Sequence, residues 1–158
     1  MTRLIKKVLE RQKVFDLTLK ILAFISKFSW LDGITQKLTT ALAQMNVTLN
    51  KADRKATVSD LAHSWKSMMP PDGEAFFHIS KVEEKTAYAE IHLHCPLRGT
   101  GRVHDCYKLM NYDRQLMDKV GGQLIVLDSQ SNSGKNYCRL AIRKKEAKSG
   151  DLIPAHKK

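Results

Sequence analysis

Residues 74–95 read EAFFHISKVEEKTAYAEIHLHC, and here the sequence pattern changes from helical to strand-like. Two runs, EAFFHISK and TAYAEIHLHC, flank the polar tetrapeptide VEEK, which is typical of a β-hairpin. In the second run every other residue from Ala87 to Cys95 is apolar or small, whereas the residues between them, Tyr88 to His94, carry polar groups. Because successive side chains of a strand point to opposite faces, this pattern predicts one buried face and one polar face.

A second pair of strand-like runs lies near the C-terminus. QLIVLDSQ (residues 123–130) and NYCRLAIR (residues 136–143) flank the pentapeptide SNSGK, which predicts another hairpin. Between the two hairpins, apolar residues recur at helical spacing over residues 103–120. We therefore expect segments 76–81 and 86–95 to join the two later segments in one antiparallel sheet, with a helix across it.

The N-terminal third has a helical pattern. Apolar residues recur three, four or seven positions apart over residues 3–28, and Thr57 or Ser59 is placed to cap a later helix. Between these, residues 34–46 predict a helix with one apolar face, formed by Ile34, Leu38, Leu42 and Met45. The predicted fold class is α+β: N-terminal helices, then a β-hairpin, a helix and a β-hairpin that form a four-stranded antiparallel sheet with helices packed on one face.

Length and charge suggest the domain organisation. We interpret residues 1–143 as a single α+β domain, with residues 1–50 as its N-terminal helical part and residues 74–143 as its sheet-containing part. Residues 144–158 are expected to form a basic flexible tail. Lys and Arg outnumber Asp and Glu by 27 to 16, and the net charge of +11 favours anionic partners, whether nucleic acid, an acidic membrane surface, an acidic ligand or an acidic protein. The first helix could lie on an anionic membrane, but an apolar face as wide as its own is more typical of a core helix or a dimer seam.

The cysteines and the N-terminal apolar stretch bear on the compartment. Three cysteines, an odd number without a regular ladder, indicate reduced thiols and a cytoplasmic protein. The stretch VFDLTLKILAFISKFSWL is interrupted by Asp16, Lys20 and Lys27. It therefore does not match a membrane-spanning helix, which needs about 20 predominantly apolar residues.

Histidine and cysteine side chains are the candidate metal ligands. His92 and His94 are two residues apart, so on a strand both imidazoles would point to the same side and could bind one metal ion. Cys95 ends a predicted strand, Cys106 lies early in the next helix and Cys138 lies in the last strand, so the topology could bring all three together. Thiolates suit zinc or iron, whereas a buried free cysteine also packs like a small apolar residue.

The same region offers a candidate nucleophile and a candidate anion site. The catalytic candidates are Cys95 or Cys106 as the attacking thiolate. Its base would be His104 or His94. Arg98 and Arg102 bracket the glycines of RGTGR before a predicted helix, an arrangement that could bind an anion through backbone N–H groups. A turn with positive φ at the glycines explains the same residues equally well.

Two stretches resemble a known family. HCPLRGTGRVHDC, followed by GGQLIVLDSQSNSGKNYCRLAIR, resembles the 4-vinyl-reductase-type small-molecule-binding domains and is similar to the L-2-amino-thiazoline-4-carboxylic acid hydrolase-like family. The resemblance covers residues 75–143 and rests on a Cys-Pro step after a strand, a cysteine on the next helix and a final hairpin. In that hairpin the pattern Gly-x-x-Tyr-Cys-Arg-x-x-Ile is formed by Gly134, Tyr137, Cys138, Arg139 and Ile142.

The resemblance implies an α+β domain, often dimeric, that encloses a pocket for a small apolar or aromatic molecule. Some members of these families bind zinc through cysteines and a glutamate. Cys138 matches the last of those cysteines, but the other two positions fall near Gln130 and Leu127, so Cys95 and Cys106 would have to replace the missing ligands. The hydrolase name implies attack on a C=N or amide-like bond, and no catalytic residue is carried over.

The favoured interpretation is a small-molecule-binding domain with a cysteine-lined pocket. The domain is expected to form a homodimer, and zinc or iron is the candidate cofactor. Arg98, Arg102 and Tyr137 are the expected ligand contacts of the pocket. The first alternative is a hydrolase acting on a small C=N or amide-like substrate. The second is a basic adaptor that binds an acidic partner or nucleic acid.

Overall fold

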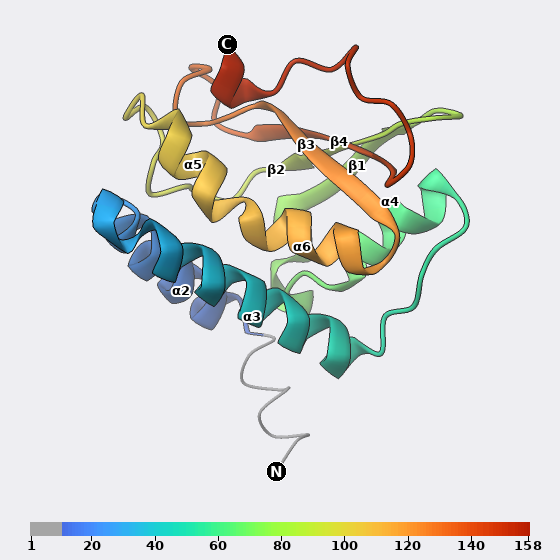
Figure 1. Ribbon diagram of the computed structural model, residues 1–158, viewed down its shortest axis with the longest axis horizontal. Helices are drawn as coiled ribbons and strands as arrows, with labels where there is room; N and C mark the ends of the chain where they lie inside the picture. Colours follow the sequence, from blue (N-terminus) through green and yellow to red (C-terminus); the bar gives the residue numbers. More distant parts are fainter. Residues whose placement is uncertain (1–10) are drawn as a thin grey trace.

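The fold is α+β, as predicted, with a four-stranded antiparallel sheet covered by helices. A computed structural model describes residues 11–158 (Figure 1). The strands pair in the order β1-β2-β4-β3. All four predicted segments are confirmed as β1 (Phe77–Val82), β2 (Ala87–Ile91), β3 (Gly122–Asp128) and β4 (Cys138–Lys144).

The last strand is central in the sheet. β4 pairs with β2 on one side and with β3 on the other, so that Leu140 lies opposite both Ala89 and Val126. Leu140 and its neighbour Ile142 are completely buried. The alternation predicted for the second run holds within β2, because Ala87 and Ala89 are buried and face the helices.

β2 ends at Ile91, four residues before the predicted end of the strand at Cys95. The buried side chain of Gln130 takes the place of a neighbouring strand beyond this point. Its Nε2 donates to the carbonyl oxygen of Leu93 at 2.8 Å, and its Oε1 accepts from the backbone N–H of Cys95 at 3.3 Å. A side chain therefore pairs two backbone groups that a neighbouring strand would otherwise pair.

Two helices form a hairpin below the sheet in Figure 1. They are α2 (Gln12–Ile25) and α3 (Asp32–Asn50), joined by the short turn η1 (Ser29–Leu31). Residues 3–10 of the first predicted helix lie outside the described residues.

The predicted apolar face of α3 is only partly correct. Leu42 packs against the core, but Ile34, Leu38 and Met45 are exposed. The helix instead buries a stripe of small residues against α6 (Asn111–Lys119), formed by Thr35, Thr39 and Ala43. Small side chains allow two helices to approach closely, and the threonine hydroxyls bond within α3, with Thr39 Oγ1 2.8 Å from the Thr35 carbonyl.

A third helix, α4 (Val58–Ser67), lies against the sheet. It begins where predicted, because Thr57 caps it by accepting a hydrogen bond from the backbone N–H of Asp60 at 3.0 Å. Trp65 and Leu61 are fully buried between this helix and the strands. The chain then passes through η2 (Pro71–Phe76) into β1.

The helix predicted over residues 103–120 is divided in two. α5 (Val103–Leu109) and α6 meet at Met110, whose ψ of 0° ends one helix and starts the next. The division places the buried amide of Asn111 against α3, where its Nδ2 donates to Thr39 Oγ1 at 2.9 Å and Thr40 Oγ1 at 3.2 Å. This interhelical contact fixes the hairpin of α2 and α3 to the rest of the domain.

The segment after β4 runs along the sheet on the side away from α2 and α3 (Figure 1). Arg143 holds Asp151 through two contacts of 2.6 Å, and Ala155 in η3 (Ala155–Lys157) is buried. β4 itself includes Lys144, one residue past the predicted domain end. The predicted flexibility of residues 144–158 concerns motion and stays a prediction. Among residues 11–158, no helix is both long and apolar enough to span a bilayer.

Candidate functional site: a cavity lined by three cysteines

A cavity of about 170 Å³ lies between the helical hairpin and the sheet. α2 and α3 form two of its walls, and the ends of the strands together with α5 and α6 close the other side. The wall from α2 carries Phe15, Leu19 and Leu22, whose spacing places them on one face of that helix. Met45, half exposed on α3, marks where the cavity approaches solvent.

Aromatic side chains pack together in one part of the cavity wall. Phe15 of α2 meets Phe77 of β1 edge to face with ring centroids 6.0 Å apart, and it meets Tyr112 of α6 at 6.5 Å. Trp65 supports Phe77 from behind at 5.9 Å. Phe15, Phe77 and Tyr112 thus line the cavity as packed aromatic rings in edge-to-face contact.

All three cysteines line this cavity. Cys95 lies in the loop after β2, Cys106 on α5, and Cys138 at the first position of β4. They are free thiols, and Cys106 and Cys138 are buried. The topology thus brings together three side chains from three separate segments.

Burial keeps these thiols protonated. It raises the pKa of Cys106 to about 11 and the pKa of Cys138 to about 12, and it raises the pKa of Cys95 as well. Ser129 Oγ donates to Cys106 Sγ at 3.0 Å, which lowers the pKa of Cys106 by less than burial raises it. A nucleophilic cysteine needs the opposite shift, so the geometry favours the thiols as neutral, polarisable lining.

The remaining catalytic candidate does not face the cavity. His104 is exposed on α5, two positions before Cys106, so the two side chains point to different sides of the helix. Cys106 therefore has no histidine base at hydrogen-bond distance within the described residues. The catalytic assignments of Cys95, Cys106 and His104 stay predictions that the local geometry does not favour.

Metal binding by the predicted ligands also lacks a ready geometry. Within residues 11–158, no three His, Cys, Asp or Glu side chains are grouped so that they could hold a metal ion. The thiols would have to lose protons that burial retains. The residues as placed therefore do not fit the zinc site that the resemblance implies, and the zinc or iron assignment stays a prediction.

The histidine pair lies beyond β2, so the premise that both residues share a strand is wrong. His92 Nε2 contacts Glu90 Oε2 at 2.8 Å, and its ring stacks on Tyr137 with centroids 5.0 Å apart and an interplanar angle of 14°. His94 is exposed. Tyr137 thus packs on the outer surface with His92, and it is not among the residues that line the cavity.

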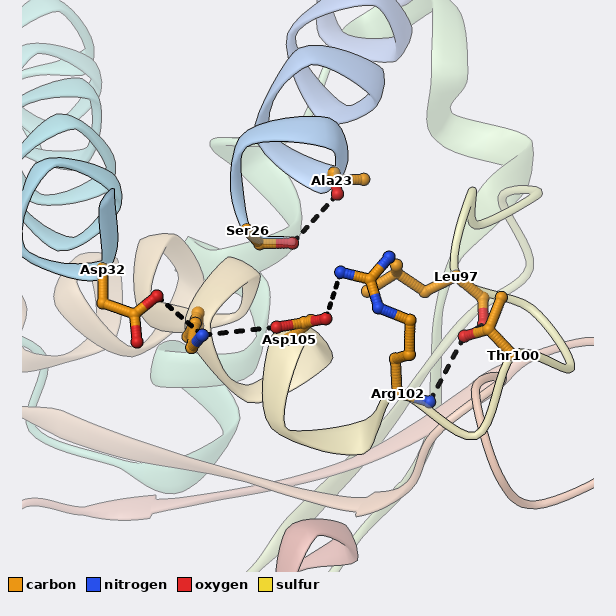
Figure 2. Close-up of polar contacts among 8 residues, drawn as sticks. Ala23, Ser26, Asp32, Leu97, Thr100, Arg102 and Asp105 are labelled. Carbon is orange, nitrogen blue, oxygen red and sulfur yellow. Dashed lines mark hydrogen bonds and ion pairs between the residues drawn. The ribbon is translucent and has the colours of Figure 1, made fainter. Parts of the chain in front are cut away.

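The two arginines predicted to bind ligand are used within the protein. Arg98 donates through Nε to Gln130 Oε1 at 2.7 Å and through Nη2 to the carbonyl oxygen of Asn136 at 2.9 Å. Arg102 forms an ion pair with Asp105 (Figure 2). Its backbone N–H donates to Thr100 Oγ1 at 3.3 Å. Both arginines therefore stabilise the loop that leads into α5.

The glycines of RGTGR form a turn with positive φ, which was the alternative to an anion site. Gly99 and Gly101 have φ of +68° and +71°, a region that favours glycine. Their backbone N–H groups donate to the carbonyl oxygens of Gln130 at 2.9 Å and Ser131 at 2.8 Å. The N–H groups of both glycines are thus bonded to residues 130 and 131 and are not directed at a bound anion.

The sequence did not predict that one end of the cavity carries buried polar side chains. Asp113 of α6 is buried and accepts a hydrogen bond from Trp65 Nε1 at 2.9 Å. Burial raises the pKa of Asp113 to about 6, although the bond from Trp65 and the charge of Arg114 act in the opposite direction. Trp65 and Asp113 are 48 residues apart, so no local pattern could have paired them.

Asn46 and Tyr112 complete the polar end. Asn46 Nδ2 donates to the Tyr112 hydroxyl at 2.6 Å and to the carbonyl oxygen of Met68 at 3.0 Å. Asn50, one turn later on α3, donates to Asn46 Oδ1 at 2.7 Å. The cavity therefore combines an apolar body with a small cluster of hydrogen-bonding groups at one end.

No family model, curated protein or solved structure that was compared with the chain matches it. The resemblance of residues 75–143 to the small-molecule-binding family stays a prediction.

Proposed function

We propose that this domain binds a small, mainly apolar molecule in the cavity between the helical hairpin and the sheet. The observation that carries the proposal is the cavity itself, enclosed by elements from both halves of the chain and lined mostly by apolar side chains. Ligand sites of this kind combine apolar walls with a few polar groups that orient the ligand.

The cavity volume limits the size of the ligand. A dry apolar cavity of roughly 150 Å³ is known to accept benzene, and the volume here is about 170 Å³. A single aromatic ring or a short branched chain therefore fits, whereas larger ligands would require α2 and α3 to separate. Methionine side chains, such as Met45 and Met110 in the lining, adapt readily to different shapes.

The polar end favours a ligand with one hydrogen-bonding group. Asp113, Tyr112 and Asn46 lie together there, and the carboxyl of Asp113 accepts one bond from Trp65 in the protein. A phenol, an indole or a small amine would place its polar group against this cluster and its ring among the apolar walls. The neutral thiols would contact the ring as polarisable, weakly polar neighbours.

The experiment is a thermal-shift series with benzene, phenol and indole, followed by calorimetry for any probe that stabilises the protein. A probe at about ten times its Kd adds about 1.4 kcal/mol to the free energy of unfolding, which corresponds to a rise in Tm of roughly 3–6 °C for a domain of this size. The Leu19→Trp variant, which fills the cavity, should abolish the shift.

The matched control is Leu17→Trp. Leu17 lies two positions before Leu19 on the same helix but is exposed, so this variant changes the same residue type outside the cavity. It should keep the full thermal shift. The proposal fails if none of the probes stabilises the unmodified protein, or if Leu19→Trp responds to them as strongly as Leu17→Trp does.

A further inference from the structure

The helical hairpin carries large apolar side chains on its outer surface. On α2, Leu17, Ile21 and Phe24 follow one another at helical spacing, and the exposed fractions of Leu17 and Phe24 are 59% and 60%. On α3, Ile34 and Leu38 lie one turn apart and are also exposed, while the small threonine stripe faces inward. Each helix therefore has a second apolar face beyond the one that the domain uses.

Aromatic side chains join the two stripes at the tip of the hairpin. Phe24 and Phe28 lie edge to face with centroids 5.6 Å apart, and Phe28 lies 6.4 Å from Trp30. Trp30 in the turn η1 is 78% exposed. The tip lies at the left edge of the molecule in Figure 1, away from the sheet. This aromatic cluster, formed by Phe24, Phe28 and Trp30, is accessible to a partner.

Cations surround the cluster. Residues 11–51 contain six Lys or Arg and two Asp, and one of those carboxylates, Asp32, is paired with Lys108 at 2.6 Å (Figure 2). Lys20, Lys27 and Lys37 are exposed beside the apolar stripes, and Lys27 Nζ lies 5.7 Å from the centre of the Phe24 ring. The surface thus combines exposed aromatic rings with a local excess of positive charge.

We propose that the α2–α3 hairpin docks on the surface of an anionic phospholipid bilayer. The aromatic cluster would enter the boundary between headgroups and acyl chains, a level at which amphipathic Trp side chains are favoured. The lysines would contact the lipid phosphates, and each cation near an anionic membrane surface strengthens binding. A bilayer matches both properties of this surface, since it offers apolar depth beneath a layer of negative charge.

A second copy of the chain matches the surface less well. In a two-fold dimer the same patch faces itself, so the lysines of one copy would meet those of the other. No cluster of carboxylates on the hairpin compensates for this repulsion, because Asp16 and Asp32 are its two acidic residues. Charge complementarity therefore favours the bilayer, and the dimer becomes one outcome of the test.

The two tryptophans provide a native probe of docking. Trp30 is exposed at the tip, whereas Trp65 is fully buried in the core. On vesicles of phosphatidylcholine with phosphatidylserine, the fluorescence of Trp30 should shift to the blue, and brominated lipid should quench it. The Trp30→Phe variant retains Trp65 as its one tryptophan and should show neither change.

Substitutions separate the apolar and the charged contributions in a sedimentation assay with the same vesicles. The double variant Phe28→Ser/Trp30→Ser should bind at least roughly tenfold more weakly, because two aromatic side chains lose their insertion. Its control is Ile153→Ser, which removes an apolar residue that is 61% exposed on the C-terminal segment. The control should bind like the unmodified protein.

Charge is tested by Lys27→Gln, with Lys85→Gln in the β1–β2 turn as its control. Loss of a cation at the membrane surface should weaken binding roughly fivefold for Lys27, and hardly at all for Lys85. Pure phosphatidylcholine vesicles should bind weakly, and added salt should release the protein from the anionic ones.

Three results would overturn the proposal. The protein could remain in the supernatant with anionic vesicles at low salt, or bind neutral and anionic vesicles equally. Alternatively, sedimentation velocity could show that the unmodified protein is a dimer and that Phe28→Ser/Trp30→Ser is a monomer, which would assign the surface to a second copy.

Discussion

Replacing Asp113 by asparagine should change how stability depends on pH. The pKa of an aspartate in the unfolded chain is about 3.9, and burial raises the pKa of Asp113 to about 6 in the folded protein. Between these two values the folded state binds a proton that the unfolded state does not. The contribution of Asp113 to stability is therefore fully present below about pH 4 and is lost as the pH rises through about 6.

The size of the effect follows from the pKa difference. Two pKa units at about 1.4 kcal/mol each amount to about 3 kcal/mol of unfolding free energy. Asp113→Asn removes the titrating group, and the Asn side-chain oxygen can still accept the bond from Trp65 Nε1. The unfolding free energy of the unmodified protein minus that of Asp113→Asn should fall by about 3 kcal/mol between about pH 4 and about pH 8.

The assay is urea unfolding of both proteins across this pH range, followed by circular dichroism. All other carboxyl groups are common to the two proteins, so their contributions cancel in the difference. Asp53→Asn, which changes an exposed carboxylate in the loop before α4, should give a nearly flat difference. A difference for Asp113→Asn that is constant, or that grows with pH, would refute the argument that burial raises the pKa of this carboxyl.

Other predictions address the thiols, the loop and the C-terminal segment. Cys106→Ala should lower the free energy of unfolding by about 1–2 kcal/mol in urea titrations and leave the metal content unchanged in elemental analysis. Native-state alkylation should modify the partly exposed Cys95 well before Cys106, as peptide mass spectrometry would show. Gly101→Ala should destabilise by roughly 1–2 kcal/mol in thermal unfolding, because φ is +71° there. Thr86→Val should cost about 1.5–3 kcal/mol by the same measurement, since Arg143 Nε donates to the Thr86 hydroxyl at 2.7 Å in a buried site.

The sheet could be predicted from the sequence because its signals are local. Alternation within Ala87 to Ile91 and the turn residues between the runs depend only on neighbouring residues. The approach of the three cysteines followed from the expected topology, since a strand end, the next helix and the last strand meet at one edge. The end of β2 was missed because a side chain 35 residues away, that of Gln130, replaces the strand partner.

Periodicity alone could not predict which face of α2 and which face of α3 is buried. Each helix has apolar residues on more than one face, and which face is buried depends on the partner. On α3 the small residues Thr35, Thr39 and Ala43 pack against α6 because Asn111 fixes the two helices together. A cysteine-lined pocket was expected from the sequence, but its walls from α2 and α3 were not, since they depend on how these two helices pack against the sheet.

The central position of β4 has a consequence for synthesis on the ribosome. β1 and β2 emerge early and can form a hairpin, but β3 has no strand partner until residues 138–144 have left the exit tunnel. Until these residues emerge, the nascent chain carries an incomplete sheet, in which β3 has no neighbouring strand and α4 has only β1 and β2 of its three strand contacts. Folding is thus expected to be late and concerted, and a chain truncated before Cys138 should need chaperones and be degraded instead of forming a smaller stable domain.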